Sequence, residues 1–182
     1  ENASINANNA SSTGVLANDD DNANFDSESL AVTNVSSNST GNSGSATQGV
    51  LGTYGTLTVA ADGTYTYTAN TAAAEALDAG DEVTDIFTYT VKDDDDVNSD
   101  TATLTITVTG IDDNPVGNND AGAINEDKTL TVSAGSGVIS NDTDADASSS
   151  LSVSAISGGT VGQALNGTYG VLTLSSDGSY TY

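Results

Sequence analysis

The stretch GTYGTLTVAADGTYTY, from Gly52 to Tyr67, decides the fold. Leu57 and Val59 alternate with threonines before its centre, and Tyr65 and Tyr67 alternate with threonines after it. Such period-two alternation is typical of a half-buried β-strand, with β-branched threonine on the outer face. The Asp-Gly pair between the two runs is a strong hairpin signal. The stretch therefore predicts two antiparallel strands joined by a tight turn.

The chain repeats this stretch. GTYGVLTLSSDGSYTY runs from Gly167 to Tyr182, so that Tyr54 and Tyr169 are 115 positions apart. Further upstream, GVLAND at 14–19 matches GVISND at 137–142, 123 positions later, and we place the eight extra residues of the first copy in the Ser- and Gly-rich segment 36–49. A period near 115 is too long for a solenoid repeat and has the size of a small domain.

Alternation of the same kind recurs along the chain. It occurs in TATLTITVTG at 101–110, FTYTV at 87–91, LAV at 30–32, LTV at 130–132 and LSV at 151–153. Short alternating strands separated by Gly, Asn, Asp and Ser turns predict an all-β antiparallel sandwich. About seven strands over roughly 110 residues is the size of an immunoglobulin-like domain. The Ala-rich segment 70–85 predicts at most one helical turn or a short connection.

The two copies and the only proline, Pro115, define the domain organisation. We predict a first sandwich over residues 1–112, a linker over 113–120, and the N-terminal part of a second, incomplete sandwich over 121–182. The chain is then expected to be a window onto a longer tandem protein.

Composition excludes several classes of function. The chain has 26 acidic residues, only Lys92 and Lys128 as basic ones, no histidine, and a formal charge of −24. Nucleic acid and anionic membrane surfaces would repel it, and no apolar run is long enough to span a bilayer, so we expect neither partner. Without histidine, cysteine or arginine, and with carboxylates in solvated-looking clusters, we expect no enzymatic activity.

The acidic residues are grouped between strands, at domain ends and in the linker. The groups are Asp19–Asp21, Asp78 to Asp85, Asp93–Asp96, Asp112 with Asp113, and Asp142 to Asp146. Oxygen ligands without competing nitrogen or sulfur suit Ca²⁺. The alternative for any single group is a solvated turn, since Asp is favoured in turns for backbone reasons.

Three of these groups are expected to meet. When strands are counted up and down, the LDAGDE loop at 77–82 and the IDDNP linker at 111–115 lie at the C-terminal end of the first domain, and the DTDAD loop at 142–146 lies at the N-terminal end of the second. We therefore predict a calcium site at the domain junction.

The order of these motifs resembles a known family. LDAGDEVTDIFTYTV, followed by TATLTITVTGIDDNP, resembles the second half of a cadherin-type repeat, and DAD at 144–146 resembles the cadherin Asp-x-Asp motif. The whole pattern is more similar still to bacterial VCBS repeats, the cadherin-like or immunoglobulin-like modules of giant secreted adhesins and biofilm proteins. The resemblance implies an extracellular location and calcium bound between successive repeats.

The same resemblance implies a ligand set. Its members are Glu1, Asp78, Asp81, Glu82, Asp112, Asp113, Asn114, Asp144 and Asp146, with Glu126 repeating the Glu1 position for a following junction. Gly110 stands where cadherins carry an acid, so we expect one or two ions rather than three.

The leading functional hypothesis is a calcium-rigidified structural spacer whose partners are the neighbouring repeats of the same chain. One alternative is a subunit of an extracellular filament, in which another copy completes an open sheet by strand complementation. Another alternative is a carbohydrate-binding module with tyrosines as stacking surfaces, although alternating tyrosines in strands more often pack or pair across strands.

Overall fold

A computed structural model of the chain describes all residues except 1–3, 8–13, 20–28 and 94–98. Contacts divide the chain into two compact units, Glu1–Asp112 and Asp113–Tyr182. Each unit is described by itself.

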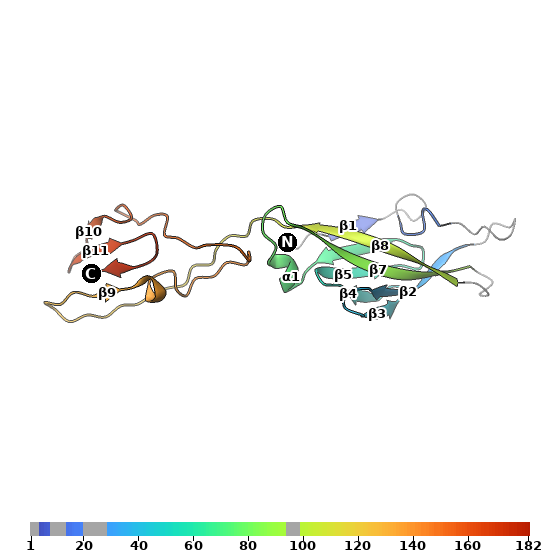
Figure 1. Cartoon of the computed structure of the whole chain (residues 1–182), viewed down its shortest axis with the longest axis horizontal. Coiled ribbons are helices and arrows are strands. Elements are labelled where there is room, and N and C mark those ends of the chain that lie inside the picture. The colour runs from blue at the N-terminus through green and yellow to red at the C-terminus, as the bar shows by residue number, and fades with distance from the viewer. Residues whose placement is uncertain (1–3, 8–13, 20–28, 94–98) are drawn as a thin grey trace. The chain divides into compact units, whose positions relative to one another are not determined.

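The first unit contains two four-stranded antiparallel sheets (Figure 1). The first sheet has the strand order β1 (Ser4–Ala7), β6 (Tyr65–Ala69), β5 (Gly55–Val59), β4 (Gly49–Leu51). The second sheet has the order β3 (Ser43–Ser45), β2 (Ala31–Ser37), β7 (Glu82–Lys92), β8 (Ser99–Thr109). The 11-residue strands β7 and β8 pair along their whole length, with Phe87 opposite Leu104. The single helix described in this unit, α1 (Ala72–Glu75), is one turn long and is capped by the Thr71 side chain.

The core lies between these sheets and follows the alternation in the sequence. Leu57 and Val59 of β5 face Phe87 and Tyr89 of β7 within one cluster of buried side chains, and Leu57 and Phe87 are fully buried. The rings of Tyr67 and Phe87 pack edge to face with their centroids 6.2 Å apart. The predicted all-β sandwich is therefore confirmed. No helix in the described part of the chain has the length and apolar character needed to cross a membrane.

The Asp-Gly hairpin turns form as predicted, once in each unit. Gly63 adopts φ +82° and Gly178 φ +81°, which L-residues with a Cβ rarely adopt. In the first turn the Thr64 hydroxyl and backbone N–H both donate to Asp62 Oδ1, at 2.7 and 3.0 Å. The hydroxyl bond, followed by the backbone bond, lowers the pKa of Asp62. Asp177 accepts the same two bonds from Ser179, and its pKa is lowered for the same reason.

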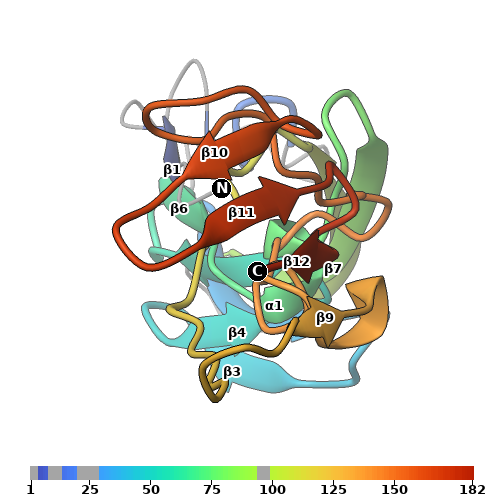
Figure 2. The same ribbon diagram turned by 90° about the vertical axis from the view of Figure 1, so that its left-hand side faces the viewer.

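The second unit repeats the first sheet of the first unit. Its strands run in the order β10 (Ala164–Asn166), β11 (Val171–Leu174), β12 (Tyr180–Thr181), β9 (Thr131–Val132), with the 3₁₀ turn η1 at Ala134–Ser136 (Figure 2). Matching hydrogen bonds recur: Val15 N–H donates to the Gly63 carbonyl in the first unit, and Val138 N–H to the Gly178 carbonyl in the second. No counterpart of the second sheet occurs among the residues of this unit, all of which are described.

Two details of strand assignment differ from the sequence-based prediction. The first unit has eight described strands rather than about seven, because the Ser- and Gly-rich segment forms β3 by pairing with β2 at a sheet edge, which needs no apolar alternation. Residues 151–153 of the second unit form no strand, although their counterparts at 30–32 lead into β2. In the first unit β2 pairs with β7, and no described residue of the second unit supplies such a partner strand.

Candidate metal-binding site

The second unit brings Asp113 against the loop at 142–146. The backbone N–H of Asp113 donates to Asp146 Oδ2 at 2.9 Å. Within the loop, the Asp146 N–H donates to Asp144 Oδ1 at 3.1 Å, a turn closed by an aspartate side chain. Two of the predicted ligands in the loop thus share a turn, and Asp113, from an earlier segment, contacts one of them, Asp146.

Backbone hydrogen bonds hold these two segments together. Val116 and Thr143 exchange both N–H to carbonyl bonds, at 2.8 and 3.1 Å, as an isolated antiparallel bridge. Two residues later, Asn118 N–H donates to Asp142 Oδ1 at 2.6 Å. Residues 113–118 of the predicted linker therefore pack onto the second unit, and this packing fixes Asp113 beside Asp146.

The main feature of the site is a pair of carboxylate oxygens that lack hydrogen-bond partners. Asp146 is only 8% exposed, yet its Oδ1 is buried and accepts no hydrogen bond from the described residues. Asp113 Oδ2 is buried in the same way. Buried carboxylate oxygens are normally hydrogen-bonded, paired or bound to a metal, because removing them from water is costly. Carboxylate oxygens are ligands that a hard cation such as Ca²⁺ accepts.

The first unit gathers another part of the predicted ligand set. Gly80 N–H donates to the Gly110 carbonyl at 3.0 Å, and Gly110 N–H donates to the Asp81 carbonyl at 2.8 Å. The 77–82 loop thus lies against Gly110, which directly follows β8 and stands two residues before Asp112. A Cβ on Gly110 would collide with the Asp78 carbonyl oxygen, which explains why this position holds no acidic side chain.

The remaining predicted ligands lie apart from these contacts. Asp112, Asn114 and Glu82 are exposed, and Glu126 is exposed in a turn. Glu1 lies outside the described residues. Within the described part of the chain, no three acidic side chains are close enough to form a complete metal cluster. Hydrogen bonds therefore connect Asp113 and Asp144 with Asp146 in one unit, and the 77–82 loop with Gly110, which follows β8, in the other.

The sequence-based prediction placed Asp85 in a group of acidic residues between strands, and the structure corrects this. Asp85 is 1% exposed and accepts four hydrogen bonds in the core. Its Oδ1 accepts from Thr53 N–H at 2.8 Å, and its Oδ2 accepts from the N–H groups of Tyr54 and Gly55 at 3.0 and 3.2 Å and from the Tyr67 hydroxyl at 2.7 Å. The alternation of β7 contained the signal, because Asp85 occupies the inward-facing set together with Phe87, Tyr89 and Val91.

This arrangement gives a reason for the repeated GTYG motif. The carboxylate of Asp85 comes from β7 in one sheet, while the Gly52–Gly55 turn joins β4 and β5 in the other. A Cβ on Gly52 would collide with that carboxylate, and a Cβ on Gly55 would collide with the backbone and ring on its other side. The motif thus binds a buried carboxylate through backbone N–H groups and ties the two sheets together.

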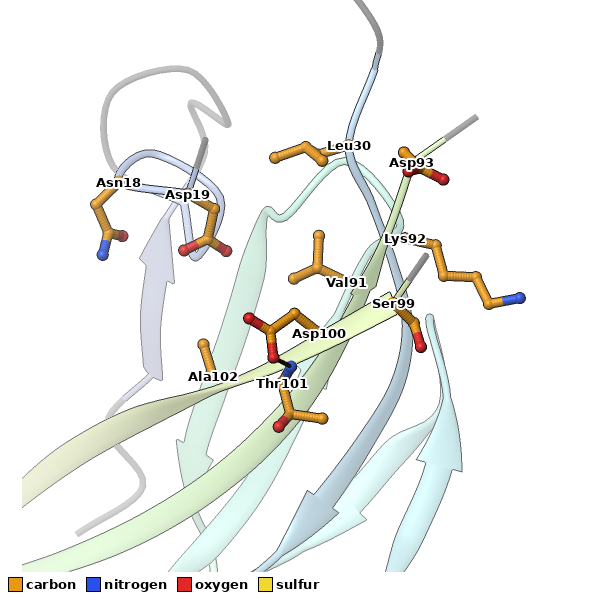
Figure 3. Close-up of a pocket in the computed structure, with 10 residues that line it drawn as sticks. All are labelled: Asn18, Asp19, Leu30, Val91, Lys92, Asp93, Ser99, Asp100, Thr101 and Ala102. Atoms are coloured by element: carbon orange, nitrogen blue, oxygen red, sulfur yellow. Dashed lines mark hydrogen bonds between the residues drawn. The ribbon is translucent and has the colours of Figure 1, made fainter. Parts of the chain in front are cut away.

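An acidic hollow also lies in the first unit (Figure 3). This cavity of about 390 Å³ is lined by Asp19, Lys92, Asp93 and Asp100 among others. The Tyr89 hydroxyl is shared between the Val15 carbonyl at 2.9 Å and Asp19 Oδ2 at 3.0 Å. Burial, followed by this bond to Asp19, raises the pKa of Tyr89 to about 12. In Figure 3 the Lys92 side chain points away from Asp19 and Asp100.

The tyrosines of the first unit are packing residues. Tyr67 and Tyr89 are buried in the core, and Tyr54 and Tyr65 pack against it. Burial, reinforced by the bond to Asp85, strongly raises the pKa of Tyr67, so its hydroxyl keeps the proton that it donates. These four rings therefore serve in packing, as alternating tyrosines in strands often do.

Comparison with known proteins decides the family. A family model described as a bacterial cadherin-like domain matches residues 1–110 and, a second time, residues 112–182. The chain belongs to the bacterial cadherin-like domain family. The resemblance to cadherin-type repeats is thereby confirmed, and the closer similarity to VCBS repeats stays a prediction. Comparison with curated proteins gave no match. Bacterial cadherin-like domains are generally non-enzymatic repeat domains of surface or secreted proteins, and domains of this kind typically bind calcium.

Proposed function

We propose that this chain is a calcium-rigidified structural spacer in a large adhesin or biofilm protein that is secreted or displayed on a bacterial cell surface. The observation that carries the proposal is the contact between Asp113 and Asp146, where two buried carboxylate oxygens lack a hydrogen-bond donor. Two bacterial cadherin-like domains in tandem are the expected composition of such a spacer.

Asp113, Asp144 and Asp146 would hold the ion in the second domain. Ca²⁺ takes six to eight oxygen ligands, more than these three side chains provide, since Asp144 and Asp146 each also accept a backbone hydrogen bond. From the motif order in the sequence, we propose the predicted ligands Asp78, Asp81 and Asp112 as the remaining donors. Water completes the coordination.

Charge supplies the driving force for such binding. With 26 acidic and two basic residues, the chain has few internal cations to offset carboxylate repulsion. A bound Ca²⁺ neutralises the local group, and ligands on both sides of the Asp112–Asp113 peptide bond would restrict the motion of one domain relative to the next. Extracellular calcium modules typically bind at about 10⁻⁴–10⁻³ M, which is sufficient for this role.

The test is a calcium titration of the whole chain. We expect isothermal titration calorimetry to show one or two sites in the sub-millimolar to millimolar range. Small-angle X-ray scattering should show a narrower distribution of interdomain distances in several millimolar Ca²⁺ than in chelator, and Mg²⁺ at the same concentration should have a weaker effect. Identical scattering and no binding heat would refute the calcium-dependent spacer.

A further inference from the structure

The Gly52–Gly55 turn of the first domain is a completed carboxylate-binding site. Three consecutive backbone N–H groups, those of Thr53, Tyr54 and Gly55, donate to Asp85, which reaches them from a strand of the opposite sheet. The Tyr67 hydroxyl supplies a fourth donor. The ligand of this turn is therefore an aspartate side chain presented by a β-strand.

The second domain builds the same turn at Gly167–Gly170. Gly167 N–H donates to the Gly170 carbonyl at 2.8 Å, just as Gly52 N–H donates to the Gly55 carbonyl at 2.8 Å. A Cβ on Gly170 would meet Tyr182 Cζ at 2.9 Å and its hydroxyl oxygen at 3.2 Å, and a Cβ on Gly55 would likewise meet Tyr67 Cζ at 2.5 Å and its hydroxyl at 2.6 Å. The tyrosine thus lies beside its turn in both domains.

The second turn has its donors in place but no carboxylate. Among the described residues, none accepts a hydrogen bond from the backbone N–H groups of Thr168, Tyr169 or Gly170. The Tyr169 side chain is 93% exposed, whereas its counterpart Tyr54 packs against the core of its own domain.

The sheet beside this turn is also uncovered. Leu165, Leu172 and Leu174 occupy the positions of Val50, Leu57 and Val59, which are almost fully buried in the first domain. In the second domain all three leucines remain partly exposed, and none belongs to the buried core. The second domain therefore presents an apolar face next to a turn with free N–H donors, and one extended segment could bind to both.

We propose that the Gly167–Gly170 turn and the apolar face of β10, β11 and β12 form a receptor for a β-strand that carries one aspartate followed by aromatic residues two and four positions later. This is the pattern of β7, in which Asp85 precedes Phe87 and Tyr89. The partial positive charge of the three N–H groups complements the carboxylate, and the leucines complement the aromatic side chains. The aspartate fixes the register, because a slip of one residue would turn it away from the turn.

The experiment uses the whole chain and two synthetic peptides of the Glu82–Lys92 sequence, one native and one with Asp85→Asn. Binding is followed by fluorescence anisotropy and by the backbone amide NMR signals of Thr168, Tyr169 and Gly170. We expect the native peptide to bind and to shift these three signals. The Asp85→Asn peptide should bind about tenfold or more weakly, since hydrogen bonds to a charged acceptor are stronger than neutral ones. The signals of Thr53, Tyr54 and Gly55 should stay in place, because their turn already holds Asp85.

A pair of chain variants isolates the receptor. Tyr182→Phe removes the hydroxyl beside the turn and should reduce the preference for the native over the Asn peptide. Tyr180→Phe on β12 should leave that preference unchanged. Equal affinity for the two peptides would overturn the proposal, as would the absence of binding. Saturation of the three amide signals by acetate alone would also overturn it, because that would show a simple anion site. The same holds if self-association of the chain saturates these signals and the peptide does not compete with it.

Discussion

The hydroxyl of Tyr67 donates a 2.7 Å hydrogen bond to Oδ2 of Asp85, and both residues are almost completely buried in the first domain. Tyr67 belongs to β6 of one sheet and Asp85 to β7 of the other, so this bond crosses the sandwich. Together with the three N–H groups of the Gly52–Gly55 turn, it satisfies a buried carboxylate without a basic partner among these contacts.

Replacing Asp85 by Asn should destabilise the first domain by about 2–4 kcal/mol. The amide keeps the shape of the side chain, but its NH₂ group would face backbone N–H donors and leave some of them unsatisfied. Urea unfolding of the whole chain measures the loss. Asp100→Asn, at an exposed position of β8, is the matched control and should change the free energy of unfolding by less than about 0.5 kcal/mol.

Replacing Tyr67 by Phe should cost about 1.5–3 kcal/mol, because it removes one hydrogen bond to a charged acceptor in the core. Tyr65→Phe, on the same strand and only partly buried, is the control and should cost less. In the background of Asp85→Asn, the Tyr67→Phe substitution should have a clearly smaller effect, since the two residues share one interaction. Simple additivity of the two substitutions would argue against a coupled network.

Stability should decline as the pH rises above about 10. The pKa of Tyr89 is raised to about 12 and that of Tyr67 is raised further, mainly by burial. Between the ordinary tyrosine value of about 10 and these raised values, the unfolded chain loses protons that the folded chain keeps, so deprotonation favours unfolding. The stabilisation is fully present below pH 10. Urea titrations from pH 8 to 11.5 measure it, and Tyr89→Phe should flatten part of the decline.

Removing Asp144 and Asp146 together by substitution with alanine should reproduce the effect of chelator. In several millimolar Ca²⁺ the variant should show the broad scattering distribution and the lower melting temperature of the metal-free native chain. The expected loss is a few kcal/mol at a hundredfold excess of calcium over its dissociation constant. Asp62→Ala, in an exposed hairpin turn, should keep the full response to calcium. An equal calcium response in both variants would place the ion elsewhere.

The second domain should exchange its amide protons faster than the first. All fifteen apolar core residues that are buried in the described part of the chain belong to the first domain, and the second domain has only one sheet. Without calcium, the amides of β10, β11 and β12 should exchange about two orders of magnitude or more faster than those of β5 and β7. Native-state hydrogen exchange by NMR measures this difference. Equal protection of the two domains would mean that the second finds its stability without a buried core.

Several features of this protein follow from the sequence by itself. The period-two alternation and the Asp-Gly turns determine strands and hairpins, because side chains on a strand alternate between faces and because Gly63 and Gly178 adopt positive φ. The spacing of the repeat determines that one local structure forms twice. The acidic composition determines that any metal held by this chain has oxygen ligands.

Other features depend on tertiary structure. The same residue type, aspartate, occurs at positions 78, 81, 85 and 113, but its environment differs. Asp85 is buried and accepts four hydrogen bonds, whereas Asp113 is hydrogen-bonded to Asp146. The difference arises because hydrogen bonds between distant segments, such as Val116 with Thr143, decide which carboxylates leave water and which donors meet them. Desolvation and hydrogen bonding act on positions in space, so neighbours in sequence acquire opposite roles only once the two sheets have packed.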